Sequence, residues 1–308
     1  MQILHTNKGI TSMQVGVAIT LVLLLSFLVV FLWRHEDANW FQSAFERSVQ
    51  KLQLMQAMSR DLLAAAEAEK SAVMAETDED SQAFAEQSIQ ASQNVDKARR
   101  ELAPLLDGKR QEAHLFQEFS RCWDKLQEID REVLSLAVQN TNLKALRLSF
   151  VPAAEAMRSM EEALNHLMDM ASAAPDAVHI TRLAAKAIMG ALNTYMLQAP
   201  HIAESTVSRM DEMEAVMHSL DAQVTDALQS LQALVDESGK PFLEAAWASY
   251  KDFQNINAAI VELSRQNSNI RSYALSLGQK RKTTAQCQDG LAALQETVQK
   301  SLTYKATK

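Results

Sequence analysis

Apolar residues recur along most of the chain in alternating steps of three and four, which is the rhythm of one face of an α-helix. No run alternates apolar and polar residues between turn signals, as a half-buried strand would. The pattern predicts an all-α protein of long amphipathic helices. Two of the apolar seams share the same steps, namely Leu115, Phe119, Cys122, Leu126, Ile129, Val133 and Leu136, and Phe242, Ala246, Ser249, Phe253, Ile256, Ile260 and Leu263.

These two seams belong to an internal repeat. The phrase QNTNLKALRLS at residues 139–149 returns as QNSNIRSYALS at residues 266–276, which is 127 positions later. Aligning residues 123–149 with residues 250–276 pairs 27 positions, of which 8 are identical. The seam changes phase at QNTN, and Asn and Thr side chains accept hydrogen bonds from free N–H groups at a helix start. We therefore interpret each phrase as a turn with an N-cap that joins two antiparallel helices.

Helix-breaking clusters divide the rest of the chain. Together with the two repeated phrases, they predict eight helical segments in two sets of four, and each set can close a four-helix bundle. Pro104 and Pro200 are alternatively tolerated as kinks within longer helices. We expect a first module at residues 35–172 and a second at residues 173–308, stacked or side by side. The clusters lie at residues 76–80, 107–109, 173–177, 198–200 and 238–241.

An uncharged apolar stretch near the N-terminus predicts a membrane anchor. At about 1.5 Å per residue, residues 15–33 are long enough to cross the roughly 30 Å hydrocarbon core of a bilayer. No small-residue cleavage site follows, so we expect an uncleaved transmembrane helix at residues 13–34, after an N-terminal segment at residues 1–12. Lys8 favours a cytoplasmic N-terminus, although Arg34 weakens that signal. The sequence thus predicts a single-pass protein of the inner (cytoplasmic) membrane, with the bulk of the chain in the periplasm.

Composition and charge narrow the function. Only 7 Gly and 5 Pro occur in 308 residues, as suits long helices, and the net charge of −8 is spread along the chain. A nucleic-acid-binding protein would need a basic face, so we expect no such partner. The two cysteines, Cys122 and Cys287, are too few for a disulfide framework. Both fall on apolar seams of different expected modules, so we predict buried thiols rather than a disulfide or a nucleophile.

Three stretches carry a resemblance to known proteins: RDLLAAAEAEKSAVMAETDED at residues 60–80, LQEIDREVLSLA at residues 126–137, and QNTNLKALRLS. Following a membrane anchor, they resemble the four-helix-bundle sensor domain of bacterial methyl-accepting chemotaxis receptors. The chain also resembles the helical bimodular variety, in which two stacked bundles share long helices. The resemblance implies a periplasmic domain that binds small molecules or partner proteins and passes a small helix displacement through the membrane.

The end of the sequence departs from that family. Such receptors continue into a second transmembrane helix and a cytoplasmic signalling hairpin, whereas this sequence ends at SLTYKATK. We expect either a truncated receptor or a protein without an output domain. The first interpretation is therefore a membrane-anchored sensory module, which forms a homodimer or joins a membrane complex. The alternative is a structural or adaptor protein that docks on another membrane complex without a small ligand.

Catalytic and metal-binding signatures are missing from the sequence. The histidines form no HExxH pattern and no CxxC with a partner histidine, and no glycine-rich phosphate loop or nucleophile elbow occurs. HLMDM at residues 166–170 and MDEMEAVMH at residues 210–218 could suit Cu(I), because thioethers and imidazoles are soft ligands. Methionine also fills gaps in apolar seams. We therefore predict no metal, no cofactor and no enzymatic activity.

A candidate ligand site emerges where the second copy of the repeat is polar and the first is not. These positions are Ser249, Tyr273, Lys280 and Thr284. A buried lysine must be paired or must meet an anion, because an isolated buried charge is costly. Together with Arg281, these residues could bind a small organic anion such as a carboxylate. Alternatively, the helix twists so that this segment faces water.

Overall fold

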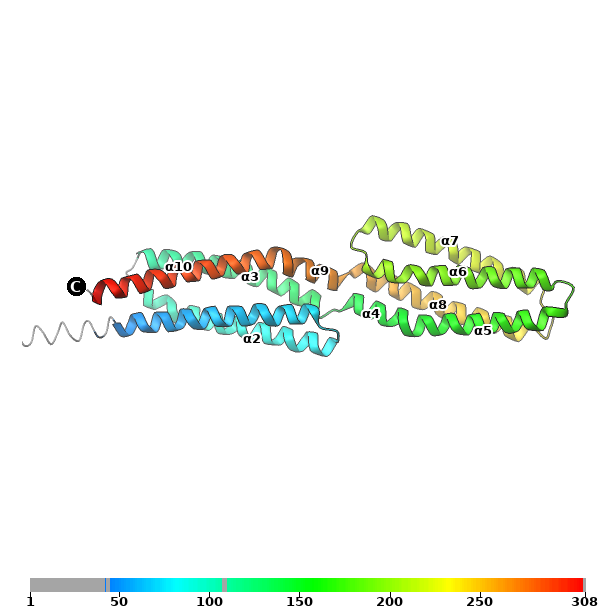
Figure 1. Ribbon diagram of the computed structural model, residues 1–308, viewed down its shortest axis with the longest axis horizontal. Coiled ribbons are helices and arrows are strands. Elements are labelled where there is room, and N and C mark those ends of the chain that lie inside the picture. The colour runs from blue at the N-terminus through cyan, green and yellow to red at the C-terminus, as the bar shows by residue number, and fades with distance from the viewer. Residues whose placement is uncertain (1–41, 43–44, 107–109, 307–308) are drawn as a thin grey trace, which may run out of the picture. The chain divides into compact units, whose positions relative to one another are not determined.

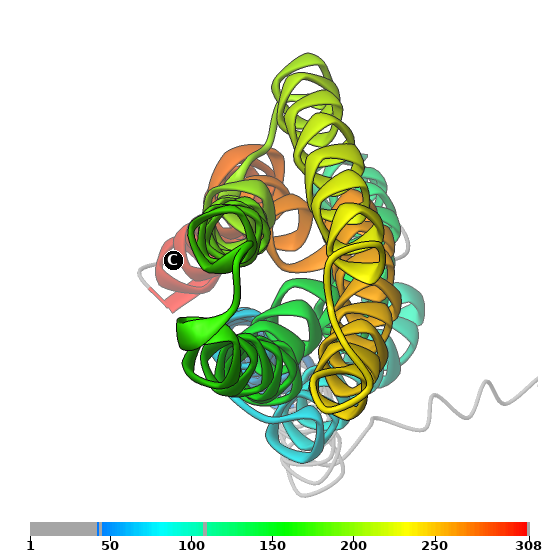
Figure 2. The same ribbon diagram turned by 90° about the vertical axis from the view of Figure 1, so that its right-hand side faces the viewer.

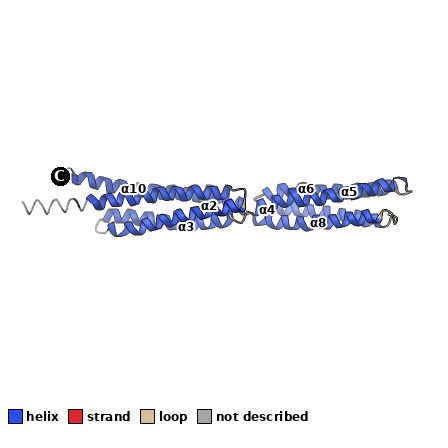
Figure 3. Ribbon diagram, turned by 90° about the horizontal axis from the view of Figure 1, so that it is seen from below, coloured by secondary structure: helices blue, strands red, loops and turns tan. Residues whose placement is uncertain are grey.

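A computed structural model describes residues 42, 45–106 and 110–306 of the chain. Each secondary-structure element in that part is a helix, which confirms the predicted all-α class (Figure 3). The predicted anchor at residues 13–34 and the segment at residues 1–12 lie outside the described residues. Among the helices that are described, none has both the length and the apolar character to span a membrane.

Short connections link the helices. The first of the described helices occupies residues 45–74. Two 3-10 segments, η1 (Ala103–Leu106) and η3 (Ala171–Ala173), follow α2 and α5, and two π-helical segments, η2 (Ser149–Ala153) and η4 (Ser276–Lys280), follow α4 and α9. The α-helices in Figure 1 are α2 (Asp78–Leu102), α3 (Arg110–Ala137), α4 (Thr141–Leu148), α5 (Ala154–Met170), α6 (Ala177–Ala203), α7 (Val207–Gln232), α8 (Lys240–Gln266), α9 (Ser268–Leu275) and α10 (Arg281–Ala306).

The chain divides into two compact units, and α2, α3 and α10 each contribute to both. In the first unit, Lys51 and Glu112 form a buried ion pair at 2.7 Å, which ties the first helix to the start of α3. The second unit contains Asp61–Asn94 and Arg121–Cys287.

Within the second unit, four segments pack into what we call the first bundle: residues 61–74, 78–94, 121–137 and 268–287. The hydroxyl of Ser81 in α2 lies 3.1 Å from the carbonyl oxygens of both Ala72 and Ala137 and so links three of them. Leu275 of α9 packs on the same apolar cluster, so the fourth segment comes from the far end of the sequence. The cluster consists of Ala72, Val73, Ala85, Ile129, Val133, Leu134 and Ala137, with Phe84, Val138 and Leu275 packed on it.

The second bundle consists of α4 to α8. Figures 1 and 2 show α5, α6 and α8 side by side, with α7 along α6, in agreement with their contacts. Leu164, Ala184, Leu228 and Phe253 lie in its continuous apolar core. The close approach of α6 to α7 depends on Gly190, because a Cβ atom there would lie 2.7 Å from the Cγ2 atom of Val224.

The repeated phrases do not join antiparallel helices, which corrects the interpretation made from the sequence. After QNTN, α4 and α5 pack against α8 in the second bundle and do not return along α3 within the first. After QNSN, the chain leaves α8 and re-enters the first bundle as α9. The chain thus crosses between bundles at one phrase and returns at the other. The contacts of α5 with α6 and α8 therefore run across the boundary expected between residues 172 and 173.

Two further expectations fail for related reasons. Pro200 lies inside α6, which continues to Ala203, so residues 198–200 are no break and the alternative of a tolerated proline is correct. Cys122 and Cys287 form a disulfide with Cα atoms 5.5 Å apart, so the prediction of two free core thiols is wrong. The crossing of α9 and α10 into the first bundle brings Cys287 to α3. The sequence placed the two cysteines in separate modules, so it did not indicate that they lie close together.

Candidate functional site

The two repeated phrases lie against each other and cap each other's helices. The N–H of Thr141 donates to Oγ of Ser268, and the N–H of Ser268 donates to Oγ1 of Thr141, both at 3.0 Å. The N–H of Asn142 donates to Oδ1 of Asn269 at 3.1 Å, and the reciprocal bond is 3.2 Å long. The predicted capping role is therefore right in kind, but each side chain caps the helix that begins in the other copy.

Side-chain amides complete this contact, which we call the junction (residues 140–142 and 267–269). Asn140 and Asn267 adopt the left-handed backbone conformation, with φ of 50° and 55°, which Asn tolerates better than most residues. Nδ2 of Asn142 donates to Oδ1 of Asn267 at 2.8 Å, and Nδ2 of Asn269 donates to Oδ1 of Asn140 at 2.9 Å. The bonds that join the two copies at the junction therefore come in reciprocal pairs.

The junction also holds the C-terminal end of α6. Nδ2 of Asn142 donates to the carbonyl oxygen of Ile202 at 2.7 Å, and Nδ2 of Asn267 donates to that of Glu204 at 2.9 Å. The carboxylate of Glu204 accepts the N–H groups of Thr206 and Ser205, which lowers the pKa of Glu204. The junction is therefore in direct contact with the turn between α6 and α7.

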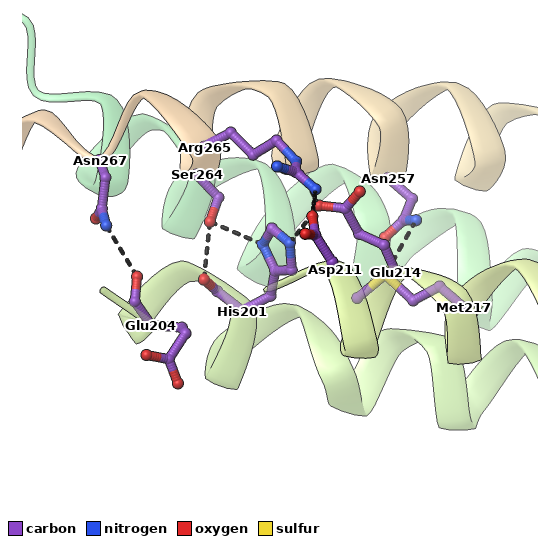
Figure 4. A network of polar contacts seen from close by, with 9 residues as sticks. All are labelled: His201, Glu204, Asp211, Glu214, Met217, Asn257, Ser264, Arg265 and Asn267. Carbon is purple, nitrogen blue, oxygen red and sulfur yellow. Dashed lines mark hydrogen bonds and ion pairs between the residues drawn. The ribbon is translucent and has the colours of Figure 1, made fainter. Parts of the chain in front are cut away.

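One residue before Ile202, a buried histidine links α6 to α7 and α8 (Figure 4). The hydroxyl of Ser264 donates to the carbonyl oxygen of His201 at 2.9 Å, so its oxygen accepts from Nδ1–H of the ring at 2.8 Å. Nε2 of His201 lies 2.9 Å from Oε1 of Glu214. A hydrogen bond from Arg265 lowers the pKa of Glu214, and Arg265 also pairs with Asp211. Glu214 thus contacts both His201 and Arg265 and links α6 to α8 through α7.

Beside this network, residues of α6, α7 and α8 line a cavity of about 480 Å³ that is open to solvent on one side, within the size range of small-molecule sites. Tyr250 and Phe253 are its buried aromatic residues, with ring centroids 6.3 Å apart. The hydroxyl of Tyr250 donates to Asp221 at 2.6 Å, and burial together with that carboxylate raises the pKa of Tyr250. The cavity is lined by Thr194, Glu214, Met217, His218, Asp221, Tyr250, Phe253, Gln254, Asn257, Ala258, Val261, Glu262 and Arg265.

The residues predicted to bind a ligand are only partly brought together. Lys280 and Thr284 line one small void of about 10 Å³ in the first bundle, which has room for about one water molecule. Tyr273 is an exposed residue of α9, and Ser249 is half-buried on α8 in the second bundle. The predicted cluster of four side chains does not form one site.

Lys280 itself is 4% exposed, so the alternative that it faces water is wrong, whereas Arg281 beside it is exposed. Its ammonium group lies 2.9 Å from Glu69 and also pairs with Asp130. The prediction that a buried lysine must be paired is therefore correct, and its partners are two carboxylates of the protein. An organic anion is not needed to match this charge.

Sequence reasoning missed the cavity and the histidine network. The cavity residues Tyr250, Gln254 and Asn257 lie beside the apolar seam of α8. The sequence feature that could have indicated the cavity was this row of polar and aromatic residues along the seam. His201 was overlooked because the preceding proline was interpreted as a helix end. The ring of His166, a candidate metal ligand, instead packs against Phe242 with centroids 5.5 Å apart. Within the described part of the chain, no group of three His, Cys, Asp or Glu side chains is placed to hold a metal ion.

Comparison with known families adds one finding. A family described as a four helix bundle sensory module for signal transduction matches residues 12–180, which is more than half of the 308-residue chain. No curated protein matches the sequence. The matched region ends just inside α6, so the second copy is related to it through the internal repeat.

Proposed function

We propose that this chain, which belongs to the family of four helix bundle sensory modules for signal transduction, takes up a small molecule between α7 and α8 and relays its presence to the junction. The cavity of about 480 Å³ carries this proposal, because it combines a buried aromatic surface with polar groups from facing helices. Two of its lining residues, Glu214 and Arg265, also belong to the network that holds His201.

The relay follows contacts that are continuous in the second unit. A ligand that draws Asp221 toward α8 also displaces Glu214, two turns away on the same helix. Glu214 bonds to His201, and the carbonyl oxygens of Ile202 and Glu204 next to it accept from the junction asparagines. Because the chain crosses between the bundles at the junction, a shift there reaches the helices of the first bundle. In this proposal, the ligand-free and ligand-bound states of the module differ in the contact between α7 and α8.

We further propose that the module is anchored in the inner membrane by residues 13–34 and lies in the periplasm. The uncharged stretch at residues 15–33 supports the anchor. The disulfide between Cys122 and Cys287 supports an oxidising compartment, since such bonds seldom persist in the cytosol. A reporter enzyme that folds only outside the cytoplasm, fused after Lys308, should be active. Activity of a cytoplasm-only reporter at that position would contradict this location.

The sensory proposal is tested by thermal unfolding of the full chain in detergent, with a panel of amino acids, organic acids, amines and sugars. A compound present at 100 times its Kd adds about 2.7 kcal/mol to the free energy of unfolding and should raise the Tm. The variant Ala258→Trp fills the cavity from its exposed rim and should abolish the rise. Ala245→Trp, at an exposed position of α8 away from the cavity, is the matched control.

The outcomes separate the two interpretations of the chain. A ligand that stabilises the parent and Ala245→Trp but not Ala258→Trp supports sensing at this cavity. Equal stabilisation of all three proteins places the ligand elsewhere and refutes the site. A panel without any rise in Tm, joined with a membrane protein that co-purifies in fixed proportion, favours the adaptor.

A further inference from the structure

The cavity between α7 and α8 is rich in carboxylates. Glu214, Asp221 and Glu262 line it, and Arg265 is the only lysine or arginine side chain among its described lining residues. That guanidinium is already engaged by Asp211 and Glu214, which match its charge within the protein. An anionic ligand would therefore enter a cavity whose one cation is neutralised and whose remaining charges repel it.

Asp221 is the lining carboxylate best placed to anchor a ligand. Its Oδ1 atom accepts from the hydroxyl of Tyr250 and from Nε2 of Gln254. For Oδ2 the structure gives no partner in the described part of the chain. The raised pKa of Tyr250 keeps its hydroxyl a donor, so the carboxylate is held in one orientation by two neutral groups. These donors position Asp221 without cancelling its negative charge, which remains for a cation.

The apolar lining continues directly from this carboxylate. Tyr250 lies one turn from Phe253 on α8, and their nearly parallel rings, at 22°, are both buried. Met217 of α7 and Val261 of α8 extend the apolar surface. Aromatic faces attract cations, and an aromatic body would bury its rings on such a surface.

We propose that the cavity binds an organic amine, with its ammonium group on Asp221 and an apolar or aromatic body against Tyr250 and Phe253. This inference rests on the proposed sensory function and deepens it by naming the ligand class. His218 and Glu262 are exposed at the rim and face the entering molecule. Glu262 adds a negative charge at the rim, which favours a cation as Asp221 does.

The test uses the full chain in detergent and three probes with the same phenyl ring. The probes are 2-phenylethylamine, which is a cation, 3-phenylpropionate, which is an anion, and phenylalanine, which is a zwitterion. Isothermal titration should show binding of the amine, with binding of the propionate at least tenfold weaker and phenylalanine between them. Asp221→Asn keeps an oxygen that accepts from Tyr250 but removes the charge, and it should weaken amine binding at least tenfold.

Asp226→Asn is the matched control, because Asp226 lies on an exposed face of α7 outside the cavity and should leave binding unchanged. Should Asp221→Asn fail to fold, loss of amine binding in Ala258→Trp decides whether the amine enters this cavity. Tighter binding of the propionate than the amine overturns the amine assignment while leaving a sensory cavity intact. Amine binding that survives Asp221→Asn unchanged, or binding of none of the three probes, also overturns it. The sensory proposal itself fails only with the broad panel.

Discussion

Replacing Asn142 with Ala tests whether the junction holds the two copies of the repeat together. The substitution removes donors to Ile202 and Asn267 and the acceptor for the N–H of Asn269. Each hydrogen bond contributes about 0.5–1.5 kcal/mol net, so three lost bonds amount to about 1.5–4.5 kcal/mol. Ala is a better helix former than Asn by about 0.5 kcal/mol, which offsets part of the loss. We expect the free energy of unfolding to fall by about 1–4 kcal/mol.

Urea unfolding followed by circular dichroism measures the change, with Asn255→Ala as the control. Asn255 is an exposed residue of α8, so its replacement should have little effect or stabilise slightly through helix propensity. Asn269→Ala loses only two of these bonds, from Asn142 and to Asn140, and should cost less than Asn142→Ala. A loss below about 0.5 kcal/mol for Asn142→Ala would refute the junction as a structural lock.

The pair also predicts non-additivity. Asn142 and Asn269 accept each other's backbone N–H groups, so removing one side chain already breaks part of the other's contribution. A double-mutant cycle should therefore show an interaction energy of about 0.5–3 kcal/mol. Additive losses in Asn142→Ala/Asn269→Ala would mean that the two copies are stabilised independently, contrary to the reciprocal capping.

Three further substitutions probe the rest of the second unit. Replacing Cys122 and Cys287 with Ser removes a disulfide that closes a loop of 165 residues. Loop entropy alone gives that bond a contribution of about 5 kcal/mol, so the urea midpoint should fall well below that of the parent and equal that of the reduced parent. An unchanged midpoint would contradict the bond. Gly190→Ala forces α7 away from α6 and should lower the free energy of unfolding by about 1–3 kcal/mol. Gly278→Ala is the control, because no heavy atom lies within 4 Å of its new Cβ, and it should not destabilise the protein. Equal effects of the two substitutions would refute the close approach of α6 and α7. The pKa of Glu214 is lowered from its ordinary value of 4.5, so its contribution to stability is fully present above that pH and is lost as the pH falls through the lowered value. Glu214→Gln should therefore flatten the decline in Tm below pH 4.5, and an unaltered profile would refute the pairing with Arg265.

The helices themselves could be predicted from the sequence because burial of an apolar face is a local pattern. Val133 and Ile260, at equivalent places in the two seams, are both fully buried as their spacing indicates. The choice of partner helix is not local, since a seam shows which face is covered and not by what. The crossing of α4 and α9 between bundles therefore escaped the sequence, and with it the disulfide and the capping between copies.

The candidate site shows the same division. Comparison of the two copies predicted that Lys280, if buried, needs a charged partner, and Lys280 is indeed buried. Its partner could not be predicted, because Glu69 lies 211 positions earlier in the chain and reaches Lys280 only through the crossing of α9 and α10. The cavity arises where α7 faces α8, and the spacing of those two helices follows from tertiary packing such as that at Gly190.

The phase break that suggested a turn has a different physical origin. A helix that leaves one bundle and enters another must reorient its apolar face toward new neighbours, and both copies do this in the same two steps. A left-handed Asn comes first, at Asn140 and at Asn267, and a π-helical segment follows at η2 and at η4. Pro152 lies in η2 while η4 contains no proline, so the proline alone is not the cause. The wider turn places Ser149 where its hydroxyl donates to the buried Gln198, which in turn bonds to Asn257 at the cavity. The features that let the chain cross between bundles thus also bring the crossing helix into polar contact with the proposed ligand site.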